Sequence, residues 1–224
     1  DIIDKNTMAK VKVQSSTLND ELGQINYIFT DKTGTLTKNN MQFKAFTVGE
    51  KSFGNIDNND EKKGKYELID MYGKITNMGF TDVNNELRNE LINKDKNGNY
   101  LIEHFFLNIL LNNSALIDNK KFHNNREIEY LCNSSDEKCL LNFARYCGYT
   151  FVDRTVDNII SIEKIVEQTK LIKINYSVSN ILEFTSERQR MSVIMKSKDI
   201  KGNDNYLLYI KGSDYMLNKR AVNK

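Results

Sequence analysis

Residues 29–37 read Phe-Thr-Asp-Lys-Thr-Gly-Thr-Leu-Thr, which places one carboxylate, Asp31, between an apolar segment and a turn rich in Gly and Thr. The segment before it, residues 23–29, is β-branched and aromatic, with apolar side chains on both of its faces. This pattern predicts a parallel strand that is buried on both sides. Open α/β sheets carry their chemistry at the C-terminal tips of such strands, so Asp31 is the first candidate catalytic residue.

The surroundings of Asp31 suit phosphoryl transfer. An aspartate can attack phosphorus and form a covalent acyl phosphate. The transferred group spreads negative charge over its oxygens, so its site needs a cation, hydrogen-bond donors and usually Mg²⁺. Lys32 supplies the cation, and the Thr-Gly-Thr turn supplies backbone N–H groups and hydroxyls. The alternative is a polar turn that closes a strand, which is the usual meaning of a single Asp-Lys or Thr-Gly pair.

The seven residues from Asp31 to Thr37 resemble, without a mismatch, the phosphorylation motif of the P-type ATPases. Residues 18–24, Leu-Asn-Asp-Glu-Leu-Gly-Gln, and residues 40–43, Asn-Met-Gln-Phe, resemble the phospholipid-flippase (type IV) class of that family. The resemblance implies that Asp31 carries the phosphate and that Lys32 is its charge partner. It also implies that Asp31 and the carbonyl of Thr33 bind Mg²⁺, while Thr35 holds the phosphoryl oxygens.

Thr33 separates this motif from related dehalogenase-fold phosphatases, in which an Asp two residues after the nucleophile acts as acid and base. A threonine is a poor proton shuttle at neutral pH, so the acyl phosphate is expected to persist. A long-lived phosphoenzyme suits a pump and does not suit a phosphatase.

Composition limits the class of protein. The 224 residues carry a net charge of +2 and are 39% hydrophobic, which fits a globular protein and gives no sign of a nucleic-acid partner. No apolar run approaches twenty residues and no signal peptide is visible, so no membrane span is expected within the chain.

The start at Asp1 is not a natural initiator and indicates a piece of a longer protein. Three cysteines without a Cys-x-x-Cys spacing and two isolated histidines indicate free thiols and no His/Cys metal site.

The remaining chain reads as helices followed by clustered strands, an α+β order. Helical spacing and capping residues predict helices over 17–22, 83–94 and 100–112. Alternating or β-branched runs predict strands over 41–48, 149–152, 159–165, 170–176 and 181–184, and a hairpin of 190–196 with 206–211. Residues 49–65 and 118–127 are predicted as polar loops, and a short helix is predicted to start at Ser213.

Residues 133–137, Asn-Ser-Ser-Asp-Glu, begin a further predicted helix that ends at Gly148. Ser134 followed by Glu137 predicts a capping box. The run also resembles a flippase segment of two serines, proline, aspartate and glutamate, whose acidic residue lines the nucleotide pocket. Here Ser135 replaces the proline. The resemblance implies that Glu137 contacts the nucleotide.

Two segments of the predicted sheet resemble flippase motifs as well. Residues 183–193 resemble the signature of the nucleotide domain, and residues 211–214, Lys-Gly-Ser-Asp, resemble its Lys-Gly-Ala-Asp. Taken singly, Phe184 reads as a core residue and Lys211 as a surface charge. Together the motifs imply an adenine pocket, in which Phe184 stacks on the base, Lys211 lies beside the nucleotide and Arg190 reaches its phosphates. Ser186 and Gly212 complete the nucleotide-binding residues that the resemblance implies.

The resemblance covers most of the chain, from Leu18 to Asp214. It implies an α+β fold class: an antiparallel sheet with flanking helices, as in the P-type ATPase nucleotide-binding domain, plus the first strand and turn of a haloacid-dehalogenase-like Rossmann domain. The implied domains are 1–47, the N-terminal part of the phosphorylation domain, and 48–224, the nucleotide-binding domain, incomplete at its C-terminal end.

The implied full protein hydrolyses ATP with Mg²⁺ to move phospholipid to the cytoplasmic leaflet. It is an integral membrane protein with a small transmembrane accessory subunit, and the present region lies on the cytosolic face of the membrane. The fragment itself is expected to bind ATP without turning it over.

Three alternatives stay open. The chain could belong to a flippase-like ATPase module fused to a guanylate cyclase, where it would act as a regulatory sensor, or to a P-type ATPase that moves another substrate. A free-standing phosphatase is disfavoured by Thr33 and by the inserted nucleotide motifs.

Overall fold

The computed structural model of the chain describes residues 3–10, 17–38, 40–54, 66–70, 73–80, 87, 90–91, 101–118, 120, 122, 127–166, 170–198 and 202–221. The chain divides into two compact units, Asp1–Asn39 and Asn40–Lys224. The domain boundary expected after residue 47 stays a prediction.

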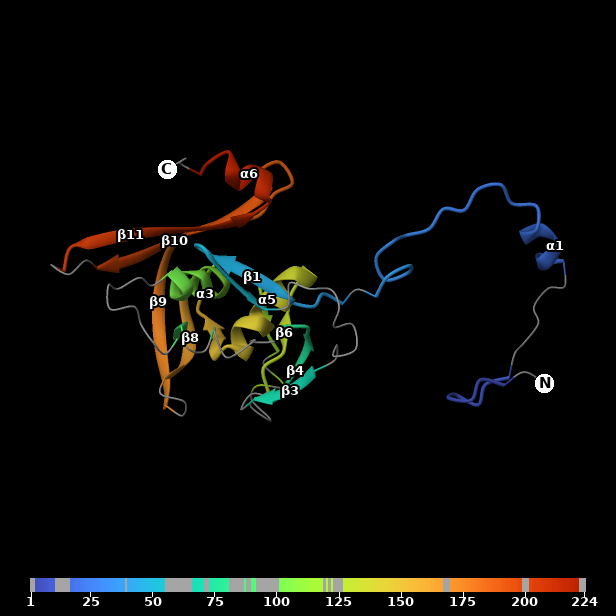
Figure 1. Cartoon of the computed structure of the whole chain (residues 1–224), viewed down its shortest axis with the longest axis horizontal. Coiled ribbons are helices and arrows are strands. Elements are labelled where there is room, and N and C mark those ends of the chain that lie inside the picture. Colours follow the sequence, from blue (N-terminus) through green and yellow to red (C-terminus); the bar gives the residue numbers. More distant parts are fainter. Residues whose placement is uncertain are drawn as a thin grey trace. The chain divides into compact units, whose positions relative to one another are not determined.

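The second unit is built on a five-stranded antiparallel sheet in the order β11-β10-β9-β8-β7 (Figure 1). The strands are β7 (Tyr149–Arg154), β8 (Ile159–Val166), β9 (Lys170–Leu182), β10 (Arg190–Lys198) and β11 (Asp204–Gly212). Each strand pairs with the next one along the chain, so local connections build the whole sheet. The predicted antiparallel sheet and its last hairpin are confirmed, although the predicted strands 170–176 and 181–184 form one strand, β9.

Helices cover one face of this sheet. The helix α3 (Leu101–Leu111) contacts β7 and β11, and α5 (Ser135–Tyr146) contacts β7 and α3 (Figure 1). Along β9, Ile174 and Val178 pack against the core, whereas Lys173 and Ser177 are exposed. This alternation is typical of a sheet with one solvated face. The helix over 100–112 was predicted from its apolar residues and the helix that ends at Gly148 from its capping residues, and both are confirmed.

Three small antiparallel strand pairs accompany this sheet among the described residues. They are β1 (Ala45–Val48) with β2 (Lys51–Gly54), β3 (Tyr66–Asp70) with β4 (Gly73–Met78), and β5 (Leu116–Ile117) with β6 (Tyr130–Leu131). The predicted strand 41–48 is confirmed only from Ala45 onward. The predicted loop 49–65 is wrong at its start, because Gly49 turns the chain at a φ of 60° and β2 then buries Phe53 in the core.

Other predictions fall partly outside the described residues. Of the predicted helix 83–94, the described residues Leu87, Glu90 and Leu91 are helical. Most of the predicted loop 118–127 also lies outside. None of the helices that the structure describes combines the length and the apolar character needed to cross a membrane.

Phe143 of α5 is the centre of an aromatic cluster that ties the hairpins to the helices. Its ring stacks on Phe43 with centroids 3.6 Å apart, and it meets Phe80 edge-on at 5.0 Å and Phe46 at 5.3 Å. Phe143 is fully buried, as is Phe106 of α3 beside it. The N-terminal segment of the second unit is therefore held by ring packing on the same helices that cover the sheet.

The first unit contains the predicted short helix, α1 (Leu18–Leu22), but not the predicted strand over 23–29. Tyr27 is 81% exposed and Phe29 is 96% exposed. A parallel strand forms only by hydrogen bonding to a neighbour. Among the described residues of this unit, the backbone bridges are Ile3 with Lys10 and Thr33 with Thr37, so no strand lies beside residues 23–29.

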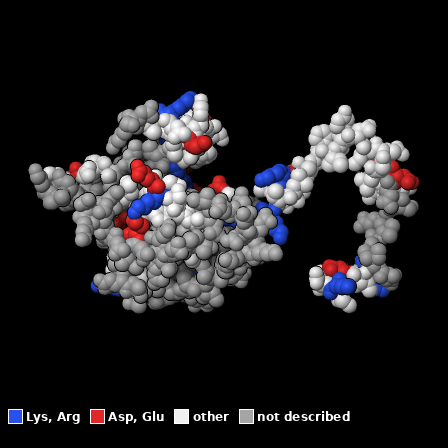
Figure 2. All heavy atoms as spheres, in the orientation of Figure 1, with Lys and Arg blue, Asp and Glu red and all other residues white. Residues whose placement is uncertain are grey.

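Basic and acidic side chains are both visible in Figure 2. Among the described residues on the face drawn there, Lys and Arg side chains lie near Asp and Glu side chains on the second unit. This distribution agrees with the small net charge of +2.

Replacing Phe143 with Ala is expected to lower the free energy of unfolding by about 3–5 kcal/mol, because it leaves a cavity among four rings. Urea denaturation followed by circular dichroism measures this change. Val156→Ala is the control: Val156 is 97% exposed, so its substitution should change stability by less than about 0.5 kcal/mol. Equal effects of the two substitutions would contradict the central place of Phe143 in the core.

Candidate functional site

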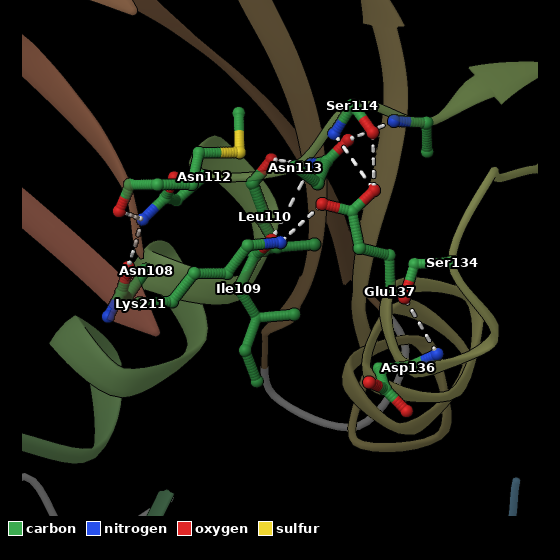
Figure 3. Close-up of polar contacts among 12 residues, drawn as sticks. Asn108, Ile109, Leu110, Asn112, Asn113, Ser114, Ser134, Asp136, Glu137 and Lys211 are labelled. Carbon is green, nitrogen blue, oxygen red and sulfur yellow. Dashed lines mark hydrogen bonds and ion pairs between the residues drawn. The ribbon is translucent and has the colours of Figure 1, made fainter. Parts of the chain in front are cut away.

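Two residues singled out in distant motifs, Glu137 and Lys211, form an ion pair, with 2.5 Å between Lys211 Nζ and Glu137 Oε1 (Figure 3). Ser114 binds the other carboxylate oxygen twice. Its backbone N–H lies 3.1 Å and its hydroxyl 2.6 Å from Glu137 Oε2. The three residues come from the first turn of α5, from β11 and from the segment that follows α3. The Glu137 carboxylate therefore joins three separate elements.

The start of α5 explains how Glu137 reaches this position. Ser134 is the N-cap, and its hydroxyl accepts a hydrogen bond from the backbone N–H of Asp136 at 3.2 Å. The cap half of the predicted capping box is confirmed. The return half is wrong, because Lys211 and Ser114 occupy both oxygens of the Glu137 carboxylate.

The electrostatics of the pair favour the charged form of Glu137, which is only 8% exposed. Burial by itself raises the pKa of the carboxyl group, but the hydrogen bonds from Lys211 and Ser114 outweigh burial and hold the pKa of Glu137 below its ordinary value. Burial and the charge of Glu137 together raise the pKa of Cys132 to about 11. That thiol stays protonated at neutral pH, which leaves it a weak nucleophile.

The strand register brings other predicted nucleotide-binding residues to the same edge of the sheet. Arg190, at the start of β10, pairs with Gly212 at the end of β11, directly after Lys211. On the other side of β10, strand β9 ends at Leu182, two residues before Phe184. Phe184 is 60% exposed, so the interpretation of its ring as a core residue is wrong.

The loop between β9 and β10 is closed by its own hydrogen bonds. Thr185 accepts one from the backbone N–H of Gln189 at 2.7 Å and, through its hydroxyl, one from the backbone N–H of Arg188 at 3.1 Å. Ser186 lies on this turn and is exposed. The loop therefore presents Phe184 and Ser186 to solvent from a hydrogen-bonded frame.

Gly212 is required where β11 ends. A Cβ at this position would lie 2.5 Å from the carbonyl oxygen of Gln189 and 2.6 Å from the Cβ of Arg190, so only glycine lets the two strands approach this closely. The next residue, Ser213, donates its backbone N–H to the same carbonyl at 3.1 Å and caps the predicted short helix, α6 (Asp214–Asn218). The Lys-Gly-Ser-Asp run therefore contains the lysine of the ion pair, the glycine that lets the two strands approach each other, and the serine that caps α6.

Ser114 was not predicted as a site residue. The sequence offers one signal for it: the polar run Asn112-Asn113-Ser114 follows directly on the apolar helix α3. Asn112 and Asn113 are buried, which indicates that the run makes specific hydrogen bonds and is not a solvated helix end.

The phosphorylation-motif residues belong to the first unit, where they form a compact exposed turn. The carbonyl of Lys32 accepts hydrogen bonds from the backbone N–H groups of Leu36 at 3.0 Å and Thr37 at 3.1 Å. Gly34 has a φ of 85°, which is the left-handed conformation that glycine adopts at no steric cost. Asp31 Oδ1 accepts the backbone N–H of Lys32 at 2.7 Å. Thr33 and Thr35 lie on the same turn.

The donor set at this turn fits a magnesium ion only in part. Mg²⁺ prefers six oxygen ligands, and Asp31 and the carbonyl of Thr33 offer oxygens of the right kind. Within the described ranges, no group of three or more His, Cys, Asp or Glu side chains gathers to hold a metal. These two residues would therefore supply only some of the ligands.

Comparison with known proteins places much of the second unit in one family. Residues 102–221 match the family described as P-type ATPase, cytoplasmic domain N. The match spans α3, α5, the five-stranded sheet and most of the residues that surround the Glu137–Lys211 pair.

Three of the individual relatives are all named phospholipid-transporting ATPases. The chain is 34% identical over 218 residues to the phospholipid-transporting ATPase IC of Xenopus tropicalis and 33% identical over 218 residues to that of Homo sapiens, and these alignments cover 96% and 97% of the chain. It is 30% identical over 240 residues to the phospholipid-transporting ATPase DNF2 of Saccharomyces cerevisiae, which covers 92% of the chain.

The alignments with the IC proteins cover 16% of those relatives, and the alignment with DNF2 covers 14%, so the chain spans about a sixth of their length. The family match nevertheless extends over more than half of the chain and contains the sheet and helices described above. The chain belongs to the P-type ATPases, and residues 102–221 form their cytoplasmic domain N.

Proposed function

We propose that the chain is the ATP-binding and autophosphorylation region of a P-type ATPase that translocates phospholipid. The observation that carries the proposal is the Glu137–Lys211 pair at the sheet edge where the loop of Phe184 begins, within a domain N. The names of the relatives support phospholipid as the transported substrate over another cargo.

The proposed nucleotide site binds the base by stacking and by hydrogen bonds from charged groups. Phe184 is an exposed aromatic side chain on a closed loop, so its face is available to stack on adenine. Adenine presents an amino donor and a ring-nitrogen acceptor on one edge. Glu137 can accept a hydrogen bond from that amino group and Lys211 can donate one to that nitrogen, so the adjacent pair matches this edge.

Arg190 and Ser186 are the proposed phosphate contacts. Arg190 donates to the carbonyl of Arg188 at 2.9 Å and forms no ion pair with a carboxylate among the described residues, so its charge is available to an anion. Gly212 adds room, because it leaves no side chain where the strands meet.

The proposed chemistry takes place at Asp31. One oxygen of its carboxylate forms a bond to the γ-phosphorus of ATP while the bond from that phosphorus to the β–γ bridging oxygen breaks, and ADP leaves. Lys32 stabilises the added charge, and Thr35 donates to the phosphoryl oxygens. Mg²⁺, when bound by Asp31 and Thr33 with other ligands, would neutralise charge on those oxygens.

The properties of the whole protein follow from the same proposal. It would be an integral membrane protein that moves phospholipid toward the cytoplasmic leaflet, with the present region on the cytosolic face. A small transmembrane accessory subunit is part of the proposal.

Replacing Phe184 with Ala is expected to weaken ATP binding by about tenfold or more, because stacking on an aromatic ring contributes about 1–3 kcal/mol. Isothermal titration calorimetry of the 224-residue chain measures the dissociation constant. The matched control is Tyr206→Ala, since Tyr206 is a similarly exposed aromatic residue near the start of β11, at the opposite end of that strand from Lys211. If Phe184→Ala binds ATP as tightly as this control, the proposed adenine site is wrong.

The 224-residue chain is expected to bind ATP without sustained hydrolysis in the presence of Mg²⁺. Thr33 cannot act as a general base at neutral pH, and no cluster of carboxylates or histidines surrounds Asp31 among the described residues. A steady-state assay of phosphate release tests this expectation, with the Asp31→Asn chain as background. Continuous release above that background would contradict it.

A further inference from the structure

A hydrogen-bonded chain of residues lies behind the Glu137–Lys211 pair, and it reaches from β7 to the pair through the segment after α3. We propose that Ser114 and Arg154 are positioning residues of the nucleotide site, which hold the Glu137 carboxylate in place for the base. This inference rests on the proposed ATP-binding function and assigns roles to two residues outside the recognised motifs.

Ser114 fixes the carboxylate by two donors on one oxygen. Its N–H and its hydroxyl both point at Glu137 Oε2, while Lys211 donates to Oε1 (Figure 3). Both oxygens of the carboxylate are therefore held from different sides, and the group cannot rotate without breaking at least two hydrogen bonds. Ser114 as a whole residue is exposed, and its bond to the carboxylate is part-buried.

Arg154 fixes Ser114 through the neighbouring residue. Its Nη2 donates to the backbone carbonyl of Asn113 at 2.7 Å. The Asn113 side chain donates to the carbonyl of Leu110 at 2.7 Å and accepts the N–H of Ala115 at 3.0 Å. The backbone on both sides of Ser114 is thereby locked, and the donors of Ser114 stay aimed at Glu137.

The surroundings of Arg154 indicate an electrostatic contribution as well. Its guanidinium lies over the Phe151 ring, 5.8 Å from the centroid, and its buried Nε has no hydrogen-bond partner. An unsatisfied buried donor is destabilising by itself. Burial lowers the pKa of Arg154 and the negative charge of Glu137 opposes that shift, so the two groups are close enough to interact. The positive charge of Arg154 favours the ionised form of Glu137.

The charged or titratable groups that interact with Glu137 are Lys211 on β11, Arg154 on β7 and Cys132 before α5, while Lys138 on α5 acts on the same Cys132 thiol. Because the pKa of Glu137 is depressed in the folded chain, its interactions are present above the ordinary value of 4.5 and are lost as the pH falls through the lower folded value. Removing the Ser114 hydroxyl should move this loss to higher pH.

The test measures the charge state and nucleotide affinity of Ser114→Ala in the 224-residue chain. The carboxyl carbon of Glu137, followed by nuclear magnetic resonance during an acid titration without nucleotide, should titrate at higher pH than in the unsubstituted chain. ATP affinity at pH 7.5, measured by calorimetry, should fall about two- to tenfold. Ser114→Thr keeps the hydroxyl and should restore both values.

Two further variants separate positioning from folding. Ser177→Ala is the matched control, because Ser177 is an exposed serine on the solvated face of β9 and makes no contact with Glu137 among the described hydrogen bonds; it should leave the Glu137 titration unchanged. Arg154→Met should shift the Glu137 titration in the same direction as Ser114→Ala. An unchanged Glu137 titration in Ser114→Ala, or a shift of equal size in Ser177→Ala, would overturn the inference.

The outcome can be told apart from a failure of the proposed function. If Ser114→Ala has no effect while Phe184→Ala and Glu137→Gln still weaken ATP binding, the positioning role is wrong and the nucleotide site stands. If none of these substitutions changes ATP affinity, the site itself is wrong.

Discussion

The carboxylate of Glu137, held between a lysine of β11 and a serine after α3, is the constraint on which the geometry of the candidate site depends. Its two oxygens connect the first turn of α5 to the sheet edge and to the end of α3. A buried ion pair of this kind is weak evidence for net stability, because desolvation offsets much of the attraction. Removing one partner is a different matter, since it leaves a buried charge without compensation. The pair is therefore best understood as fixing where these three elements meet.

The sequence predicts the parts of the fold in which one side-chain pattern repeats. The strands β8 to β11 and the helices α3 and α5 carry apolar residues at regular spacing because one face of each meets a common core. Residues 23–29 carry an equally apolar pattern, but a strand also needs a neighbour to pair with, and the first unit has none among its described residues. The strand β2 was missed for the opposite reason: it buries one ring, Phe53, within a polar stretch.

In the candidate site, sequence patterns predict hydrogen bonds between nearby residues and miss those between distant ones. The turn after Asp31 is closed by bonds that span four or five positions, from Leu36 and Thr37 back to Lys32, so a contiguous motif contains nearly everything that shapes it. Glu137 and Lys211 are 74 positions apart, and Ser114 lies 23 positions before Glu137. Motif resemblance identified the first two residues separately. Nothing local to Ser114 indicates a carboxylate partner, and the capping-box prediction for Glu137 failed because those distant partners outcompete the local one.

The pairing of Lys211 also affects how the proposed site distinguishes the two ends of a nucleotide. An unpaired lysine attracts any anion, including the polyphosphate, and would not orient ATP. In the proposed site Glu137 would neutralise most of that attraction and leave Lys211 to act through directed hydrogen bonds. Arg190 has no carboxylate partner among the described residues, and together with nearby Arg188 and Arg220 it would supply positive charge near this sheet edge. In this proposal charge attracts the phosphates to Arg190, while the balanced pair and the aromatic ring favour the base, and that difference would orient the nucleotide.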